Sequence, residues 1–238
     1  KDKFADTSSN KNNAVTITSG IEVKGESGYG DIGLPGNNTV MAIGTNPRGN
    51  SSVSEFANMK LYSASISNET GVISSYDATN NTGNGHNSSA TTWKDLTGSN
   101  NGTVNGATWG DDYLSFDGVD DWVNLGKIDI TKQATLDVTI SVDKIQCGGW
   151  AIIDYYEGGG LGIHLENGYP AFQIYSKSQG KYVSIRAASK LTVGEKTNIK
   201  GIYDGNQLYL YVNGQPVTGT VVDVVDPIWE RVSSSASA

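Results

Sequence analysis

Apolar and polar residues alternate strictly along several stretches of the chain. In residues 136–143, LDVTISVD, four aliphatic side chains share one face while aspartate, threonine and serine take the other. Residues 14–20 and 207–214 alternate in the same way. Since successive side chains of a β-strand point to opposite faces of a sheet, this period predicts strands with one buried face. The expected core includes Leu136, Val138, Ile140, Val142, Phe172, Ile174, Ile202, Leu208 and Leu210.

Pairs of asparagine or aspartate with glycine separate the alternating stretches. Asp204-Gly205 and Asn213-Gly214 are two of them, and such pairs accept the positive φ of hairpin turns with little strain. Residues 203–219 therefore predict two consecutive hairpins. The chain has 30 glycines and only 5 prolines, and no long segment carries a helical period. We expect an all-β protein with an antiparallel sandwich and little helix.

Charge and cysteine content narrow the classes of partner and compartment. The net charge is −8 over 238 residues, and no basic stripe is present. Nucleic acid and anionic membrane surfaces are therefore not expected as partners, and no apolar run is long enough for a membrane helix. Cys147 stands alone, so no internal disulfide can form, and we expect a buried thiol. A secreted eukaryotic protein of this length would usually carry disulfides, so we expect a secreted or surface protein of a bacterium or phage instead.

Four motifs together go beyond composition. Residues 91–126 contain a tryptophan before DLTG, the hairpin sequence NNGTVNGATW, and FDGVDDWVNLG. Residues 203–214 read YDGNQLYLYVNG, 37–49 read NNTVMAIGTNPRG, and 56–67 read FANMKLYSASIS. The set resembles the laminin-G-like, concanavalin A-like domains of bacterial surface proteins. The resemblance implies an antiparallel jelly-roll β-sandwich and an extracellular location.

The order of these motifs differs from the family pattern. The segment that resembles the closing strands, residues 37–67, precedes the hairpin of residues 203–214 instead of following it. Either the chain joins the end of one repeat to the start of the next, or it is one circularly permuted domain. We favour the permuted domain, because each piece is present once and a sandwich without closing strands leaves an exposed edge. The expected division is a tail over 1–13, one sandwich over 14–231 and a tail or linker over 232–238, with closing strands in 14–76, a loop of disorder-like composition in 77–92 and the main body in 93–221.

A permuted domain makes a specific demand on strand packing. Strands 40–44 and 59–66 should pack in the same sandwich as strands 136–142 and 207–212, because their apolar residues need partners. Residues 15–23 and 217–224 should then lie near each other. The strands can close within one molecule or be exchanged between molecules, which would produce self-assembly.

Three acids stand close together among core-type residues: Asp117, Asp120 and Asp121. Asp117-Gly118 suits a hairpin corner in which the aspartate accepts backbone hydrogen bonds. Asp121 should face the same way as the apolar side chains that follow, and so needs a partner. The alternative is a Ca²⁺ site, since calcium takes oxygen ligands and some laminin-G-like domains bind it at the rim of the sandwich. Both readings stay open from the residues alone, and Ca²⁺ is the only cofactor we expect.

Catalysis is not expected. Glucanases of this fold need two carboxylates on one strand face, and Asp154 and Glu157 are spaced for opposite faces. Two lone histidines do not make a zinc site, and no G-x-S-x-G motif is present.

Aromatic and polar residues gather around the glycine-rich stretch 154–175. Sugars are recognised by exposed rings beside amide and carboxylate groups. The candidate ligand-binding residues are Tyr155, Tyr156, Glu157, Asn167 and Tyr169.

Two classes of function follow. The first is a non-catalytic extracellular adhesion or binding module that recognises a glycan or a cell-surface protein. The alternative is a structural subunit of a surface filament, a pilus, or a phage tail or virion.

Overall fold

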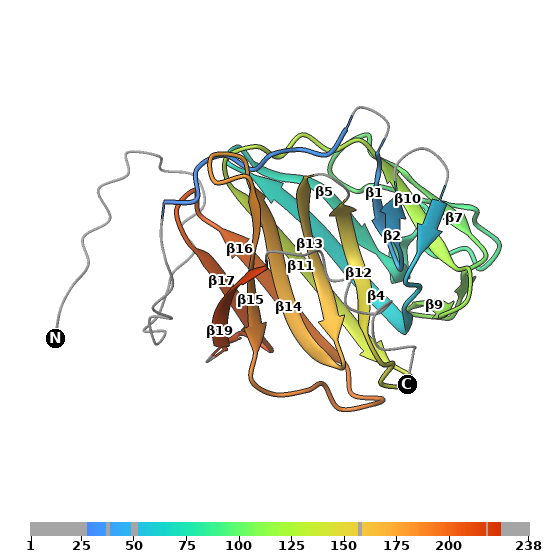
Figure 1. The fold of residues 1–238 in the computed structure, drawn as a ribbon. Helices are drawn as coiled ribbons and strands as arrows, with labels where there is room; N and C mark the ends of the chain where they lie inside the picture. The colour runs from blue at the N-terminus through green and yellow to red at the C-terminus, as the bar shows by residue number, and fades with distance from the viewer. Residues whose placement is uncertain (1–27, 37–38, 49–51, 157–158, 218, 225–238) are drawn as a thin grey trace, which may run out of the picture.

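The structure is a computed structural model that describes residues 28–36, 39–48, 52–156, 159–217 and 219–224. Two antiparallel sheets pack face to face, and the described helical structure is one 3-10 turn, η1 (Ala78–Asn80) (Figure 1). The expectation of an antiparallel β-sandwich with little helix is confirmed. No helix in these ranges is long and apolar enough to cross a membrane.

Within the described residues the larger sheet has nine strands, and their pairings are antiparallel. Its order is β19 (Gly219–Val224), β15 (Lys181–Ala187), β14 (Tyr169–Ser176), β13 (Gly160–Glu166), β12 (Gly149–Tyr156), β1 (Met41–Ile43), β10 (Trp122–Gly126), β7 (Gly102–Asn105) and β6 (Thr92–Trp93). In Figure 1 strands β12 to β15 lie toward the viewer.

The second sheet has eight strands in the part of the chain that the structure describes. Its order is β18 (Gln215–Pro216), β17 (Leu208–Val212), β16 (Thr197–Tyr203), β11 (Ala134–Val142), β4 (Asn58–Asn68), β9 (Leu114–Asp117) and β8 (Thr108–Trp109), with β5 (Gly71–Asp77) paired to β4. A separate hairpin joins β2 (Asn46–Arg48) to β3 (Ser52–Ser54). The hairpins expected over residues 203–219 are present as β16–β17 and β17–β18.

The core lies between the two sheets, and the alternating stretches supply it as expected. The predicted core residues are buried except Ile202, which is partly exposed. On β16 the inward positions are taken by Ile199, Gly201 and Tyr203, so Ile202 points to the opposite face. The Phe172 ring lies against Gly201, where any side chain would collide with it. The expectation that Ile202 belongs to the core was therefore wrong.

The N-terminal strands occupy central positions in both sheets. β1 lies between β10 and β12, and β4 lies between β11 and β9. The register places Leu61 opposite Ile140 and Ile66 opposite Leu136. The expectation that these strands share one sandwich with β11 and β17 is therefore confirmed. Residues 15–23 lie outside the described ranges, and the division of the chain into one permuted domain with two tails stays a prediction.

The polar loop of residues 77–92 is more ordered than its composition suggests. Asn81 is fully buried and exchanges hydrogen bonds with Asn87 through both atoms of its side-chain amide. The Trp93 indole N–H donates to the Asp77 carbonyl, and its ring meets that of Trp109 edge to face. Asparagine side chains replace backbone pairing here, which composition alone does not reveal.

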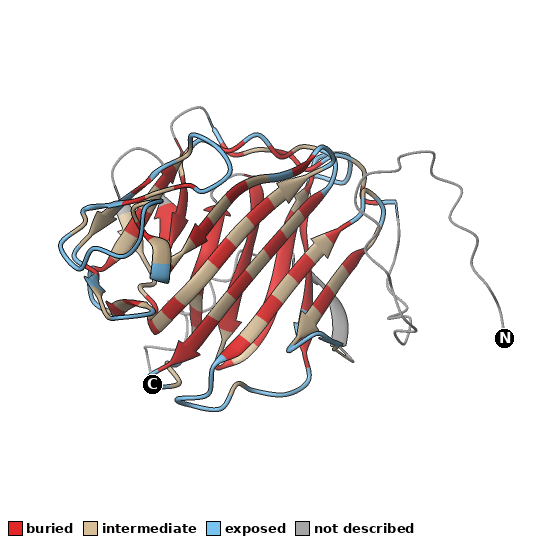
Figure 2. Ribbon diagram, turned by 180° about the vertical axis from the view of Figure 1, so that it is seen from behind, coloured by how far each residue is buried: buried red, intermediate tan, exposed pale blue. Residues whose placement is uncertain are grey.

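The two sheets differ in how their strands are buried. On β4 and β11 buried positions mostly alternate with partly exposed ones, as Figure 2 shows. On β13, β14 and β15 most consecutive positions are buried. Both faces of the larger sheet are therefore shielded from solvent along these strands.

Candidate functional site

Loops from four separate segments meet at one end of the sandwich. They are the turn after β9 (117–121), the β11–β12 connection (143–148), the β13–β14 turn (167–168) and the residues before β4 (55–57). We call this end the acidic rim. Its parts are far apart in sequence and are joined by the hydrogen bonds described below.

Asp117, Asp120 and Asp121 lie together at this rim. One carboxylate oxygen from each lies within 4.8 Å of the others, and Asp117 and Asp120 are exposed. The Asp117 Oδ1 accepts a 2.7 Å hydrogen bond from the Val119 N–H, and Gly118 has a φ of +79°. The hairpin-corner reading of Asp117 therefore describes the local geometry, and the same corner brings three carboxylates together.

Asp121 is the buried member of the cluster, with 8% of its surface exposed. Its Oδ2 accepts a 2.9 Å hydrogen bond from the Asp117 N–H, which supplies the partner that its position demands. Its Oδ1 lies over Gly106, where a side chain would collide with it. Burial raises the pKa of Asp121, the bond from Asp117 opposes that rise, and the charges of Asp117 and Asp120 add to it. A bound cation would relieve this repulsion.

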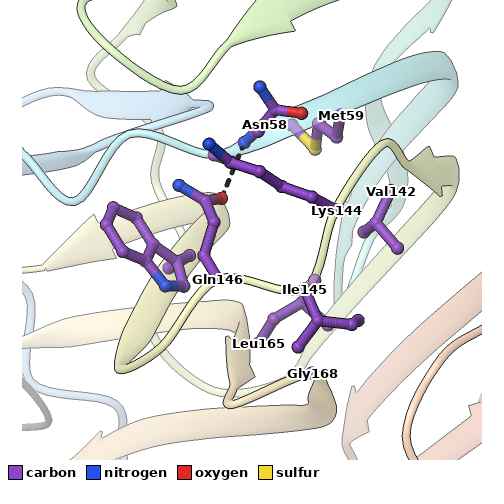
Figure 3. Close-up of a pocket in the computed structure, with 10 residues that line it drawn as sticks. Asn58, Met59, Val142, Lys144, Ile145, Gln146, Leu165 and Gly168 are labelled. Carbon is purple, nitrogen blue, oxygen red and sulfur yellow. Dashed lines mark hydrogen bonds between the residues drawn. The ribbon is translucent and has the colours of Figure 1, made fainter. Parts of the chain in front are cut away.

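A small pocket opens beside the cluster (Figure 3). The residues that line it are Ala57, Asn58, Met59, Val142, Lys144, Ile145, Gln146, Trp150, Leu165 and Gly168. They combine an apolar floor with amide groups and one ammonium group. None of the ten lining residues is a carboxylic acid.

Asn58 connects the pocket to the acidic cluster. Its backbone N–H donates to Gln146 Oε1 at 2.9 Å, and its side-chain amide donates to the Asp117 carbonyl. The Gln146 amide in turn donates to the Phe56 carbonyl at 3.1 Å. The β11–β12 connection is thereby held against the start of β4, with the acidic turn on its other side.

Trp150 and Lys144 are the aromatic and the cationic residue that line the pocket. The Trp150 indole N–H donates to the Cys147 carbonyl at 2.8 Å, and the ring is half-buried. Lys144 is exposed, and its chain runs past Asn58 and Gln146 in Figure 3. Cys147 is exposed, so the expectation of a buried thiol was wrong. In the β11–β12 connection it is Gln146 that bonds to Asn58 on β4, while the neighbouring Cys147 stays at the surface.

The five predicted ligand residues do not form one surface. Tyr155 is 4% exposed and belongs to the core, and burial raises the pKa of its hydroxyl. The Tyr156 side chain and Glu157 lie outside the described residues. Asn167 and Tyr169 lie at the other end of β13, and seven extended residues span about 20 Å. Tyr155 is close in sequence to Asn167 and Tyr169, but the length of β13 separates it from them, so they lie at opposite ends of the sandwich.

Asn167 and Tyr169 do lie near the acidic rim. Asn167 has a φ of +52°, and its Oδ1 accepts a 2.9 Å hydrogen bond from the Gly148 N–H. The Tyr169 ring is half-exposed, with the Arg186 guanidinium 5.4 Å and the Lys190 ammonium 5.2 Å from its centre. Asn167 therefore positions the β11–β12 connection, while Tyr169 offers a ring beside two cations.

Sequence reasoning missed the residues that line the pocket. Asn58 and Gln146 are 88 positions apart, and no local pattern marks them as partners. Trp150 follows two glycines, and no local pattern marked it as part of a site. Its exposure depends on how the β11–β12 connection folds.

Comparison with family models gives one match, the concanavalin A-like lectin/glucanases superfamily, over residues 116–234. The chain belongs to this superfamily. No curated protein and no solved structure matches it significantly. The matched region begins in β9, so β1, β4 and β5 precede it in the chain. The predicted resemblance to concanavalin A-like domains and the predicted fold class are confirmed, while the expected bacterial surface origin stays a prediction.

Membership in this superfamily supports a carbohydrate- or protein-binding module in general terms. Laminin G-type domains are typically extracellular and generally non-catalytic, although the superfamily also contains glucanases. The superfamily match assigns no ligand or metal to the chain.

Proposed function

We propose that the chain is a non-catalytic extracellular adhesion module that binds a glycan or a surface protein at its acidic rim. The observation that carries this proposal is the junction of the three-aspartate cluster with the Trp150 pocket through Asn58. An aromatic wall beside amides and carboxylates suits sugars and polar protein loops alike. The pocket lining lacks the pair of carboxyl groups that glycoside hydrolysis requires.

Calcium is the cation that this cluster would suit. The three aspartates offer hard carboxylate oxygens from one exposed turn, and Ca²⁺ takes six to eight oxygens in flexible geometry. Asp117, Asp120 and Asp121 would each supply one or two of these. The remaining positions would fall to water or to hydroxyl or carbonyl oxygens of the bound ligand. Ligand affinity would then depend on calcium.

Calcium at 1 mM is expected to raise the melting temperature and to increase binding to a printed glycan and surface-protein array. For a site with a Kd of about 0.1 mM, the added stability is about 1.4 kcal/mol. Asp120→Asn should abolish both effects, because it removes one of the three carboxylates that would hold the cation. The turn itself should be unchanged, since Asp120 is exposed and its replacement leaves the hydrogen bonds of Asp117 and Asp121 in place.

Asp111→Asn is the matched control, since Asp111 is an exposed acid outside the cluster. It should respond to calcium as the unmodified chain does. If chelator leaves both the melting temperature and array binding of the unmodified chain unchanged, the acidic rim is a structural turn and the proposal is wrong.

A structural subunit is the second candidate function, and the position of β1 and β4 favours it. Both strands precede the family-matched region in the chain. In the sheets, β1 lies between β10 and β12, and β4 lies between β9 and β11. The same places can be filled by the strands of a second molecule, which is how donor-strand assemblies form. A closed molecule elutes at 25.2 kDa at every concentration. We expect this closed form in size-exclusion chromatography over a dilution series, and a species that grows with concentration would instead support strand exchange.

A further inference from the structure

Most strands at the margins of the two sheets are short or covered. Among the described residues, β6, β8 and β18 each end a sheet and have two residues each, and Pro216 on β18 has no N–H to donate. β5, which branches from β4, is bonded on its outer side. There the Ser75 carbonyl accepts from the Leu96 N–H, and the Ser75 N–H donates to Asp95 Oδ1. Such edges give the strands of other molecules little to pair with.

β19 is the long exception at the margin of the larger sheet. Its six residues pair with β15 in one continuous antiparallel register. In the part of the chain that the structure describes, no strand pairs with its other side, and Figure 1 shows it at the margin of the sandwich. Backbone groups of a strand point alternately to its two sides, so about half of the N–H and C=O groups of β19 face this open edge.

The sequence of β19 suits pairing with a further strand. Residues 220–222 and 224 are threonine or valine, the strand has no proline, and Asp223 is its only charged residue. β-Branched residues favour strands, whereas exposed edges are usually blunted by charges, prolines or bulges. The edge of β19 therefore has the properties of an edge that is covered in the folded protein.

A segment with matching properties precedes the described residues. Residues 14–20, AVTITSG, alternate apolar and polar positions in the way that predicts a strand. They are β-branched at four successive positions, 15–18, and carry no charge and no proline. The segment is therefore as well suited to strand pairing as β19 itself.

The described residues that follow this segment lie close to one end of β19. The Ser178 hydroxyl, in the turn between β14 and β15, donates to the Tyr29 carbonyl at 2.9 Å. Tyr182, near the start of β15, pairs with Val224, the last residue of β19. A strand added beyond β19 would lie two strand spacings from β15, about 10 Å. Residues 21–28 can span up to about 26 Å when extended, so the connection is long enough within one molecule.

We propose that residues 14–20 pair with the open edge of β19 in the same chain and add a strand to the larger sheet. The short connection places Gly20 nearer to Val224 than Ala14, so the added strand runs parallel to β19. It protects the edge from strands of other molecules, which agrees with the closed form expected in size-exclusion chromatography. The contact is separate from the acidic rim and does not depend on the ligand proposed for it.

Residue-resolved hydrogen exchange of the full chain tests this pairing. In the unmodified chain, every N–H of β19 should exchange slowly, on the open side as well as on the side of β15. Thr16→Pro and Ile17→Pro are the two informative variants. The N–H groups of successive residues point to opposite sides of a strand, so one of the two variants loses a bond to β19. In that variant, the N–H groups on the open side of β19 should exchange at least about tenfold faster, while β11 in the opposite sheet stays protected.

Asn10→Pro is the matched control, since it places the same residue type outside the pairing segment, and it should exchange as the unmodified chain does. The proposal is overturned by fast exchange on the open side of β19 in the unmodified chain, by no change in either informative variant, or by an equal change in Asn10→Pro. Size-exclusion chromatography over a dilution series identifies the source of the strand. A monomer with slow exchange at every concentration supports pairing within the chain. Protection that falls on dilution, together with a larger species at high concentration, means that a second molecule supplies the strand and also overturns the proposal.

Discussion

Leu61→Ala is expected to lower the free energy of unfolding of the entire sandwich by about 2–5 kcal/mol. Leu61 is fully buried on β4, opposite Leu114 on β9 and Ile140 on β11. Truncation leaves a cavity between strands that come from distant parts of the chain. If residues 14–231 form one permuted domain, as we propose, every probe should report a single destabilised transition. Denaturant unfolding followed by tryptophan fluorescence and by far-ultraviolet circular dichroism measures this.

Val72→Ala is the matched control for this experiment. Val72 lies on β5, the strand paired to β4, and 53% of its surface is exposed. Its replacement should change stability by less than about 0.5 kcal/mol. Two separate transitions, with only the first sensitive to Leu61→Ala, would mean that the N-terminal strands form an independent unit.

His164 is expected to make the protein sensitive to acid. Burial lowers the pKa of His164 to about 4, from an ordinary value of 6.5. The unfolded chain therefore binds the proton more readily, and the contribution of His164 to stability is lost as the pH falls from 6.5 toward 4. A shift of this size corresponds to about 3 kcal/mol. Unfolding measured at pH 4 and pH 7 should show His164→Gln gaining that amount relative to the unmodified chain at the lower pH.

Asp154 affects the pH dependence of stability in the opposite direction to His164. The pKa of Asp154 is raised in the folded protein. Its contribution to the free energy of unfolding is therefore complete below the pKa of the unfolded chain, and it is lost as the pH rises toward the pKa of the folded protein. The two groups lie 3.9 Å apart, and burial holds both neutral, so they are not an ion pair near neutral pH. Asp154→Asn should therefore stabilise the protein at pH 7. The unmodified chain should show a flatter pH profile than either variant, and equal profiles for all three would contradict this account.

Local sequence determined the strands and their turns. Alternation located β11 and β17, and the Asx-Gly pairs located the hairpins that follow β16, because side-chain direction and turn backbone depend on neighbouring residues. The same logic put Asp121 on the same face as the apolar residues that follow it, Val123 and Leu125, which are buried, and it put Asp117 at a corner. The three aspartates could also be expected to lie together, since one tight turn carries all of them.

Tertiary structure alone decided which of these elements meet. The pocket depends on Asn58 and Gln146, which are 88 positions apart in the sequence. The predicted ligand cluster failed to assemble because the length of β13 separates Tyr155 from Tyr169. Strand pairing between distant segments is set by burial of the whole sandwich, which no local period encodes. Local sequence thus specified the alternating strands, their hairpin turns and the three-aspartate corner, and packing specified the pocket beside that corner.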